Sequence, residues 1–250
     1  MEDLVWKTSD AVFVITVGTA TVCFCLYWFV AHSERLKAWV DARNGDGYFD
    51  QYGAVYQKLI GVLYLGGLPM LATLLLLPGT PENYGLGDAN WTISLYWILL
   101  FGGAISFIPW YTARQKEMYS FYPQIRARDW SRRLLVVNAL VWTLYMFAYE
   151  FLFRGFLLMG VASVYGWWPA IIVTTALSAT THLPKGGKET FGTIPLSIVL
   201  SLIVIQTGAI WACVAAHAIL AISNDYWAVF YHPEMRFKEN GVLEEVKSSR

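Results

Sequence analysis

The chain has 250 residues, of which 56% are hydrophobic and only 14% are charged, and its mean hydropathy is +0.44. Soluble domains carry about 25% charged residues, so this composition excludes an ordinary soluble protein and indicates a membrane protein with several spans. The 18 basic residues balance the 18 acidic residues, so there is no basic excess to attract nucleic acid. We therefore expect the lipid bilayer as a partner and no nucleic acid.

Seven apolar runs are long enough to be candidate membrane-spanning helices. In chain order they cover residues 10–31, 58–78, 91–111, 134–159, 163–181, 192–207 and 209–230. A helix needs about 20 apolar residues to cross a bilayer, and it satisfies its own backbone hydrogen bonds in hydrocarbon. No internal repeat and no Pro- or Ser-rich linker divides the chain. The sequence therefore predicts one all-α membrane domain over residues 1–250, a polytopic helical bundle of about seven spans.

Lysine and arginine residues alternate between successive loops, and this alternation predicts the orientation of the bundle. Loop 32–57 holds three basic residues and loop 112–133 holds six, whereas loops 79–90 and 160–162 hold none. By the positive-inside rule, basic loops face the cytoplasm. We therefore expect the N-terminus outside and the C-terminus in the cytoplasm. The compact chain is typical of bacterial proteins, so a bacterial cytoplasmic membrane is the expected location.

The fourth apolar run carries two charged residues, Glu150 and Arg154, within a segment long enough to cross the bilayer. A charge at mid-membrane costs on the order of 2.5–3.5 kcal/mol by insertion scales, so an ionisable residue there indicates a functional site. Four residues apart on a helix, the two side chains share a face and can form an ion pair. The alternative interpretation is a buried ion pair that serves structure alone.

Two histidines, His182 and His217, lie inside later apolar runs at comparable depths. At 1.5 Å per helical residue, Glu150 lies roughly 15 Å, His182 roughly 22 Å and His217 roughly 13 Å from the outer end of its span. Asn224 follows His217 by two helical turns and shares its face. These depths are compatible with one polar pocket in the middle of the bilayer. Nothing in the one-dimensional pattern requires the three helices to be adjacent.

This set of residues is suited to hydrolysis by water. A carboxylate held by an arginine can act as a general base on water, and a histidine can position that water or share its proton. A second histidine and an amide can donate hydrogen bonds to a developing oxyanion. Two histidines and a glutamate can also bind zinc, but no H-E-x-x-H pair exists and the histidines lie on separate helices. We therefore expect no cofactor and no metal, with a divalent metal as the minor alternative.

Residues 134–230 resemble the CAAX protease and bacteriocin-processing (CPBP) family of intramembrane endopeptidases. The first family motif has two glutamates, three variable residues and an arginine, and it corresponds here to residues 149–154. The second motif, an aromatic residue four positions before a histidine, corresponds to residues 178–182. The third, a histidine with Asn or Asp four residues later, corresponds to residues 217–221. Residues 1–133 match no motif of the family and are expected to be variable N-terminal spans of the same domain.

The resemblance implies a helical membrane peptidase that hydrolyses a membrane-associated peptide or protein. The relatives cleave prenylated C-terminal peptides or process bacteriocins and leader peptides. By analogy, Glu150 and His182 activate water, Arg154 holds the carboxylate, and His217 stabilises the oxyanion. Asn224 is the nearest substitute for the amide of the third motif.

Three positions depart from the family pattern. Tyr149 stands in place of the first glutamate, Ser178 in place of the aromatic residue, and Ala221 in place of Asn or Asp. Glu150 must then serve as the base while it pairs with Arg154, and a neighbouring arginine makes a carboxylate a weaker base. The alternative is therefore a proteolytically inactive relative that acts as a membrane scaffold or binds partners in a membrane complex. A transporter is disfavoured, because the sequence shows no repeated discontinuous helices.

Overall fold

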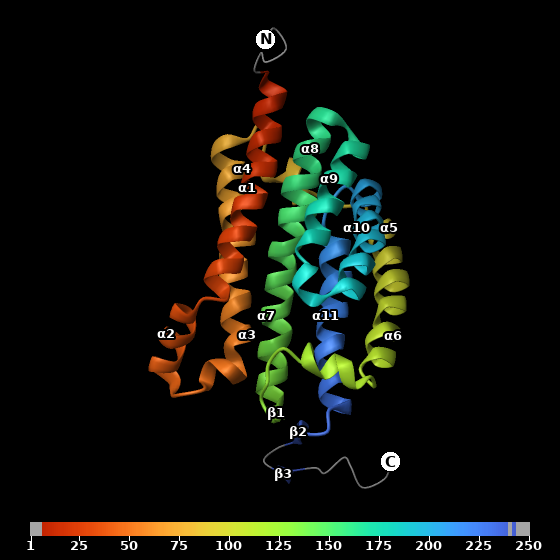
Figure 1. Ribbon diagram of the computed structural model, residues 1–250. Helices are drawn as coiled ribbons and strands as arrows, with labels where there is room; N and C mark the ends of the chain where they lie inside the picture. The colour runs from red at the N-terminus through yellow and green to blue at the C-terminus, as the bar shows by residue number, and fades with distance from the viewer. Residues whose placement is uncertain (1–6, 240–241, 244–250) are drawn as a thin grey trace.

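The structure is a computed structural model and describes residues 7–239 and 242–243. Residues 1–6 and 244–250, the two ends of the predicted single domain, lie outside these described residues. Long helices run side by side along one axis, and α1 begins at the end of the bundle opposite to β2 (Figure 1). The architecture is the all-α polytopic bundle that the sequence predicts.

The N-terminal half consists of three long helical stretches and one short helix. They are α1 (Thr8–Ala31), the short α2 (Glu34–Asn44), then α3 (Tyr48–Gly61) continuing through a π-helical segment (Val62–Gly67) into α4 (Leu68–Leu76). A 3₁₀ turn (Pro81–Tyr84) precedes α5 (Trp91–Trp97), a second π-helical segment (Ile98–Gly102) and α6 (Gly103–Thr112). A further 3₁₀ turn (Lys116–Ser120) begins the connection to the C-terminal half.

The C-terminal half contains the three predicted motifs. Its helical elements are α7 (Arg132–Glu150), a third π-helical segment (Phe151–Leu157), α8 (Leu158–Tyr165), α9 (Trp167–Thr180), a 3₁₀ turn (Leu183–Lys185), α10 (Gly187–Thr207) and α11 (Trp211–Tyr231). The strands are β1 (Asp129–Ser131), β2 (Arg236–Glu239) and β3 (Val242–Leu243). Strand β1 pairs in parallel with β2, which places Asp129 opposite Arg236, and β2 pairs antiparallel with β3.

Local sequence signals set the ends of the helices that carry the motifs. Ser131 caps α7, because its hydroxyl accepts a hydrogen bond from the backbone N–H of Leu134 at 3.2 Å. Gly166 lies between α8 and α9 with φ of 80°, and Gly208 follows α10 with φ of 79°. Glycine adopts these positive φ values without the steric cost of a Cβ atom, so both helices end there.

Six of the described helices are long and apolar enough to cross a membrane. They are Thr8–Ala31, Tyr48–Leu76, Trp91–Thr112, Arg132–Tyr165, Gly187–Thr207 and Trp211–Tyr231. The predicted span 163–181 corresponds to α9, whose 14 residues rise only about 21 Å. Large apolar side chains such as Phe29, Leu75 and Leu99 are at least 67% exposed, as suits a lipid-facing surface. The chain is thus an integral membrane protein, and its orientation stays a prediction.

Helices α9 and α10 form a hairpin that ends inside the bundle. The two helices pack along each other, and the turn that joins them lies partway along α7 and α11 (Figure 1). The turn contains His182 and Pro184, and the helix α9 ends just before them, as a proline in this place predicts. The short α9 therefore carries His182 to the interior of the bundle rather than to its end.

The third π-helical segment lies at the centre of the packing. All seven residues of Phe151–Leu157 are buried, and the segment contacts α1, α4, α9 and α10. Its apolar side chains, including Phe151 and Phe156, belong to the main hydrophobic core. π-Helical segments within α-helices are frequent at functional sites, and this one begins directly after Glu150.

A substitution at Gly155 tests how tightly the π-helical segment Phe151–Leu157 is packed. A Cβ atom at Gly155 would lie 2.5 Å from the backbone carbonyl oxygen of Tyr84 and 3.0 Å from the ring of Phe151. Since the backbone of a turn cannot yield easily, we expect Gly155→Ala to destabilise the fold by about 1–3 kcal/mol. Gly18→Ala is the control, because nothing lies within 4 Å of its added Cβ. Thermal unfolding in detergent should separate the two variants, and equal Tm values would contradict this packing.

Candidate active site

Glu150 and Arg154 form the ion pair that their spacing predicts, and His217 joins it from another helix. Nε of Arg154 lies 3.4 Å from Oε2 of Glu150. The other carboxylate oxygen, Oε1, accepts a hydrogen bond from Nδ1 of His217 on α11 at 2.6 Å. The side chains of Glu150 and Arg154 are 0% and 1% exposed, so each charge depends on the other for compensation. The α7 and α11 segments of the predicted site are therefore in direct contact.

His182 and His217 have the same protonated nitrogen. Nδ1 of His182 donates a hydrogen bond to the backbone carbonyl of Ser178 at 3.0 Å. A carbonyl or a carboxylate oxygen can only accept, so Nδ1 carries the proton in His182 and also in His217, where Glu150 is the acceptor. In the neutral rings, Nε2 is then the unprotonated nitrogen. Both histidines therefore keep Nε2 as a hydrogen-bond acceptor and potential base.

Tyr149 lies next to both histidines. Its ring centroid is 6.4 Å from the ring of His182 and 5.7 Å from the ring of His217, with both pairs edge to face. The Tyr149 hydroxyl lies 3.2 Å from the hydroxyl oxygens of both Ser178 and Thr181 on the α9 side. Two of the three departures from the motif pattern thus contact each other, a large side chain at 149 opposite a small one at 178.

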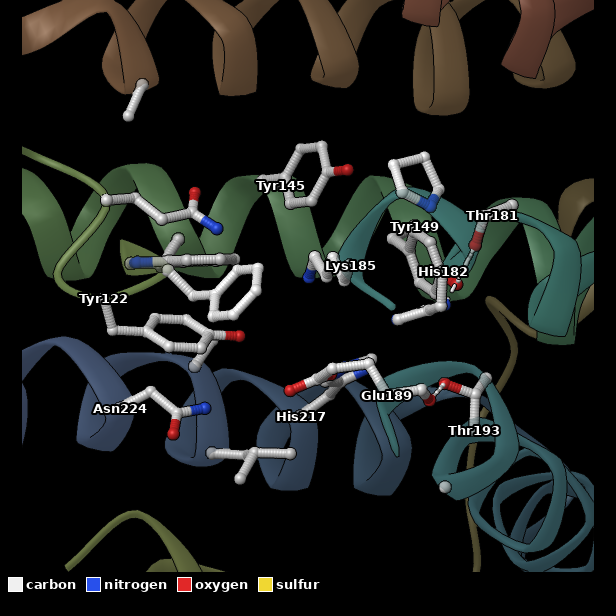
Figure 2. A pocket seen from close by; sticks show the side chains of 18 of the residues that line it. Tyr122, Tyr145, Tyr149, Thr181, His182, Lys185, Glu189, Thr193, His217 and Asn224 are labelled. Atoms are coloured by element: carbon white, nitrogen blue, oxygen red, sulfur yellow. Dashed lines mark hydrogen bonds between the residues drawn. The ribbon is translucent and has the colours of Figure 1, made fainter. Parts of the chain in front are cut away.

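These residues lie against a cavity of about 1250 Å³, which α1, α3, α6, α7, α10, α11 and the 115–126 connection enclose. Tyr149, Thr181, His182, His217 and Asn224 are among the residues that line it (Figure 2). Glu150 and Arg154 do not line the cavity, because they are fully buried next to His217. The structure therefore brings His182, His217 and Asn224 to one surface and places the ion pair behind it.

Two charged residues of the hairpin also face the cavity. Lys185 follows His182 in the 3₁₀ turn, and Glu189 lies in the first turn of α10 (Figure 2). Neither residue is among the site residues predicted from the sequence. The available signal was their position, since both follow His182 within seven residues of a proline-broken helix end. Position in the sequence does not show whether a side chain points into the cavity or away from it.

Lys58 closes the cavity from the N-terminal half through a buried polar network. Its ammonium donates a hydrogen bond to Oε1 of Gln124 at 2.7 Å and lies 4.0 Å from the ring centroid of Trp142. Asp225 is fully buried and accepts hydrogen bonds from Nε1 of Trp142 at 2.6 Å and from the backbone N–H of Gln124 at 3.0 Å. The network ties α3, the connection before β1, α7 and α11 together.

His182 is neutral at neutral pH. Burial, and next the positive charge of Lys185, lower the pKa of His182 from its ordinary value to about 4. Burial also lowers the pKa of Lys185, while the charges of Glu189 and Asp225 oppose that change. In the described part of the chain, no group of three or more His, Cys, Asp or Glu side chains is arranged to hold a metal ion.

The buried ion pair predicts a large effect on stability. Arg154→Met would leave the Glu150 charge without its partner, so we expect a loss of about 3–5 kcal/mol in the free energy of unfolding. Lys37→Met is the control, because it breaks the exposed Lys37–Asp50 pair and should cost no more than about 1 kcal/mol. Thermal unfolding of both variants in the same detergent measures the difference. A similar, small effect of both changes would show that Glu150 is compensated elsewhere.

The charge of Lys185 predicts a shift in the titration of His182. A nearby cation disfavours the imidazolium, so Lys185→Met should raise the pKa of His182 above about 4. Lys188→Met should leave it unchanged, because the Lys188 side chain is 92% exposed and pairs with Glu117 at 3.5 Å. NMR titration of histidine-labelled protein measures the pKa, with His182→Asn to assign the signal. An unchanged or lower pKa in Lys185→Met would refute the electrostatic contact.

One comparison with known proteins bears on this site. The family model described as Type II CAAX prenyl endopeptidase Rce1-like matches residues 131–223, which contain Glu150, Arg154, His182 and His217. No curated protein and no solved structure matches the chain. The matched segment begins at the cap of α7 and ends within α11, so it covers the helices that build the polar site. Through this segment, the chain is similar to type II CAAX prenyl endopeptidases, in agreement with the resemblance seen in its motifs.

Proposed function

We propose that the protein is an intramembrane endopeptidase that hydrolyses a membrane-associated peptide. The observation that carries this proposal is the short hydrogen bond between Glu150 and His217, at 2.6 Å, next to a cavity that His217 and His182 both line. A carboxylate that holds Nδ1–H of a histidine orients Nε2 toward the reacting groups and stabilises the imidazolium that forms there. The family match supports the same class of reaction.

In this proposal, Glu150 activates water through His217. Nε2 of His217 takes a proton from the attacking water while Glu150 stabilises the resulting positive charge. Arg154 keeps the Glu150 carboxylate ionised and in place. The water oxygen forms a bond to the peptide carbonyl carbon, and the proton on His217 then passes to the leaving nitrogen as the C–N bond breaks.

His182 is assigned to the positioning of that water. The neutral ring has an unprotonated Nε2, which can accept a hydrogen bond from the water from the side opposite to His217. The resemblance pairs Glu150 with His182, whereas the hydrogen bond of Glu150 favours His217 as its direct partner. Asn224 lies two turns from His217, about 10 Å along α11, so we assign it to contacts with the bound peptide.

The cavity also bears on the kind of substrate. Its volume of about 1250 Å³ exceeds that of a usual small-molecule pocket, and apolar residues such as Phe24, Phe101 and Leu196 form part of its wall. An apolar peptide segment of several residues fits such a space better than a small polar metabolite does. We therefore propose a hydrophobic peptide or protein segment of the bacterial cytoplasmic membrane as the substrate.

Mapping of peptide termini in membranes of the source cell tests this function. Wild type, a deletion, Glu150→Gln and the control Asp50→Asn are compared at equal expression. Asp50 also lines the cavity, but its side chain is 63% exposed and pairs with Lys37. We expect the deletion and Glu150→Gln to lose the same cleaved termini, with cleavage slowed by about 10²–10⁴ in the variant, and Asp50→Asn to match wild type.

A second candidate function is that of a proteolytically inactive scaffold in a membrane complex. The observation that favours it is Tyr149, which replaces the first glutamate of the motif, contacts the rings of both histidines and is bound through its hydroxyl to Ser178 and Thr181. The same four strains distinguish the two functions. If the deletion depletes one membrane complex while Glu150→Gln matches wild type and no termini change, the peptidase proposal fails and the scaffold remains.

A further inference from the structure

Hydrolysis in this cavity requires a hydrogen-bond donor for the oxyanion. In the proposed mechanism, His217 is the base and His182 accepts a hydrogen bond from the water, so neither histidine is that donor. The Nδ1–H groups of His182 and His217 are used on the Ser178 carbonyl and on Glu150. Their free Nε2 atoms are acceptors until one of them takes a proton. A site of this kind gains most of its rate from donors aimed at the oxygen that becomes negative. That donor must therefore come from another residue of the cavity.

Several other donors of the cavity wall are already engaged. The Tyr149 hydroxyl is bound to α9, and the Thr193 hydroxyl donates to the backbone carbonyl of Glu189 at 2.8 Å. The Lys58 ammonium is held by Gln124 and by the face of Trp142. Asn224 lies about 10 Å further along α11 than His217, which is too far to serve an atom next to His217.

Lys185 is placed where such a donor is needed. Its backbone N–H donates to the carbonyl of His182 at 2.9 Å, so the two residues belong to one rigid turn. Its side chain extends into the cavity, where Figure 2 shows it between Tyr145 and His217. Among the described residues, no acceptor lies within hydrogen-bond distance of its ammonium group. Its positive charge is one cause of the lowered pKa of His182.

We propose that Lys185 is the oxyanion donor of this site. Its ammonium donates a hydrogen bond to the substrate carbonyl oxygen, which becomes negative when water adds to the carbonyl carbon. Lys185 keeps its proton throughout, because the water proton goes to His217 and then to the leaving nitrogen. This role depends on the proposed peptidase function. It would supply, from the hairpin turn, the donor that Ala221 cannot offer on α11.

The surroundings of Lys185 favour this role on energetic grounds. Burial lowers its pKa, and among the described residues no acceptor lies within hydrogen-bond distance of the ammonium. An anionic partner that forms only during the reaction is then stabilised more strongly than it would be in water. Lys188 differs from Lys185 in its exposure and in its partner, because its side chain is 92% exposed and pairs with Glu117. The two lysines are three residues apart in the sequence, so they make a matched pair for a test.

The test uses the full chain in lipid nanodiscs and a quenched fluorescent peptide that spans a cleavage site located by the terminus map. We expect Lys185→Met to lower kcat by about 10²–10³ with little change in KM, and Lys188→Met to match wild type. Lys185→Arg should recover part of kcat, because it restores a cationic donor. A phosphinate analogue of the same peptide carries the negative oxygen of the intermediate. Lys185→Met should weaken its binding by a similar factor and leave binding of the amide peptide unchanged.

Other outcomes overturn the proposal. If Lys185→Met cleaves and binds the phosphinate peptide as wild type does, Lys185 is not the oxyanion donor, although the peptidase function stands. If Lys185→Met raises KM and lowers Tm without a selective loss of phosphinate binding, its role is structural. If wild type cleaves no peptide and Glu150→Gln changes no terminus, the peptidase function itself fails, and the role of Lys185 fails with it.

Discussion

The structure depends on the ion pair of Glu150 and Arg154, which lies in the buried interior of the bundle. Each side chain is almost completely buried, so neither charge is tolerable there without the other. The pair also fixes its neighbours, because the carboxylate uses its second oxygen to hold His217 and thereby joins α7 to α11. The tightly packed π-helical segment begins between the two charges and surrounds Arg154 with core side chains. Packing of this kind holds the polar side chains in fixed positions, which the proposed hydrolysis would require.

The short hairpin of α9 and α10 gives the bundle its cavity. Because α9 has only 14 residues, its end and the following turn stop partway along α7 and α11. The turn contributes His182 and Lys185, and Glu189 follows in α10. The contact of Tyr149 with Ser178 and Thr181 anchors this turn to α7. Tyr149, the departure from the first motif, and Ser178, the departure from the second, are thus in contact with each other.

The N-terminal half is part of the site although the family match does not cover it. Lys58 of α3 and Gln124 of the connection before β1 line the cavity, and Asp225 and Trp142 bind them to the matched helices. The match begins at residue 131, so these contacts join residues within the match to residues outside it. Variation in the first 130 residues can therefore change the cavity wall without any change in the motifs.

The sequence by itself determined the membrane bundle, the Glu150–Arg154 pair and the family resemblance of the C-terminal half, because hydropathy, helical spacing and motifs are local properties of a chain. It also predicted that Glu150, His182 and His217 lie at compatible depths. Only the tertiary structure decided that Glu150 contacts His217, that Tyr149 contacts both histidines and that Lys185 faces the cavity. It likewise paired β1 with β2, whose aligned residues Asp129 and Arg236 are 107 positions apart. Periodicity gives the depth and face of a residue on its own helix, but which faces meet depends on how all the side chains pack together.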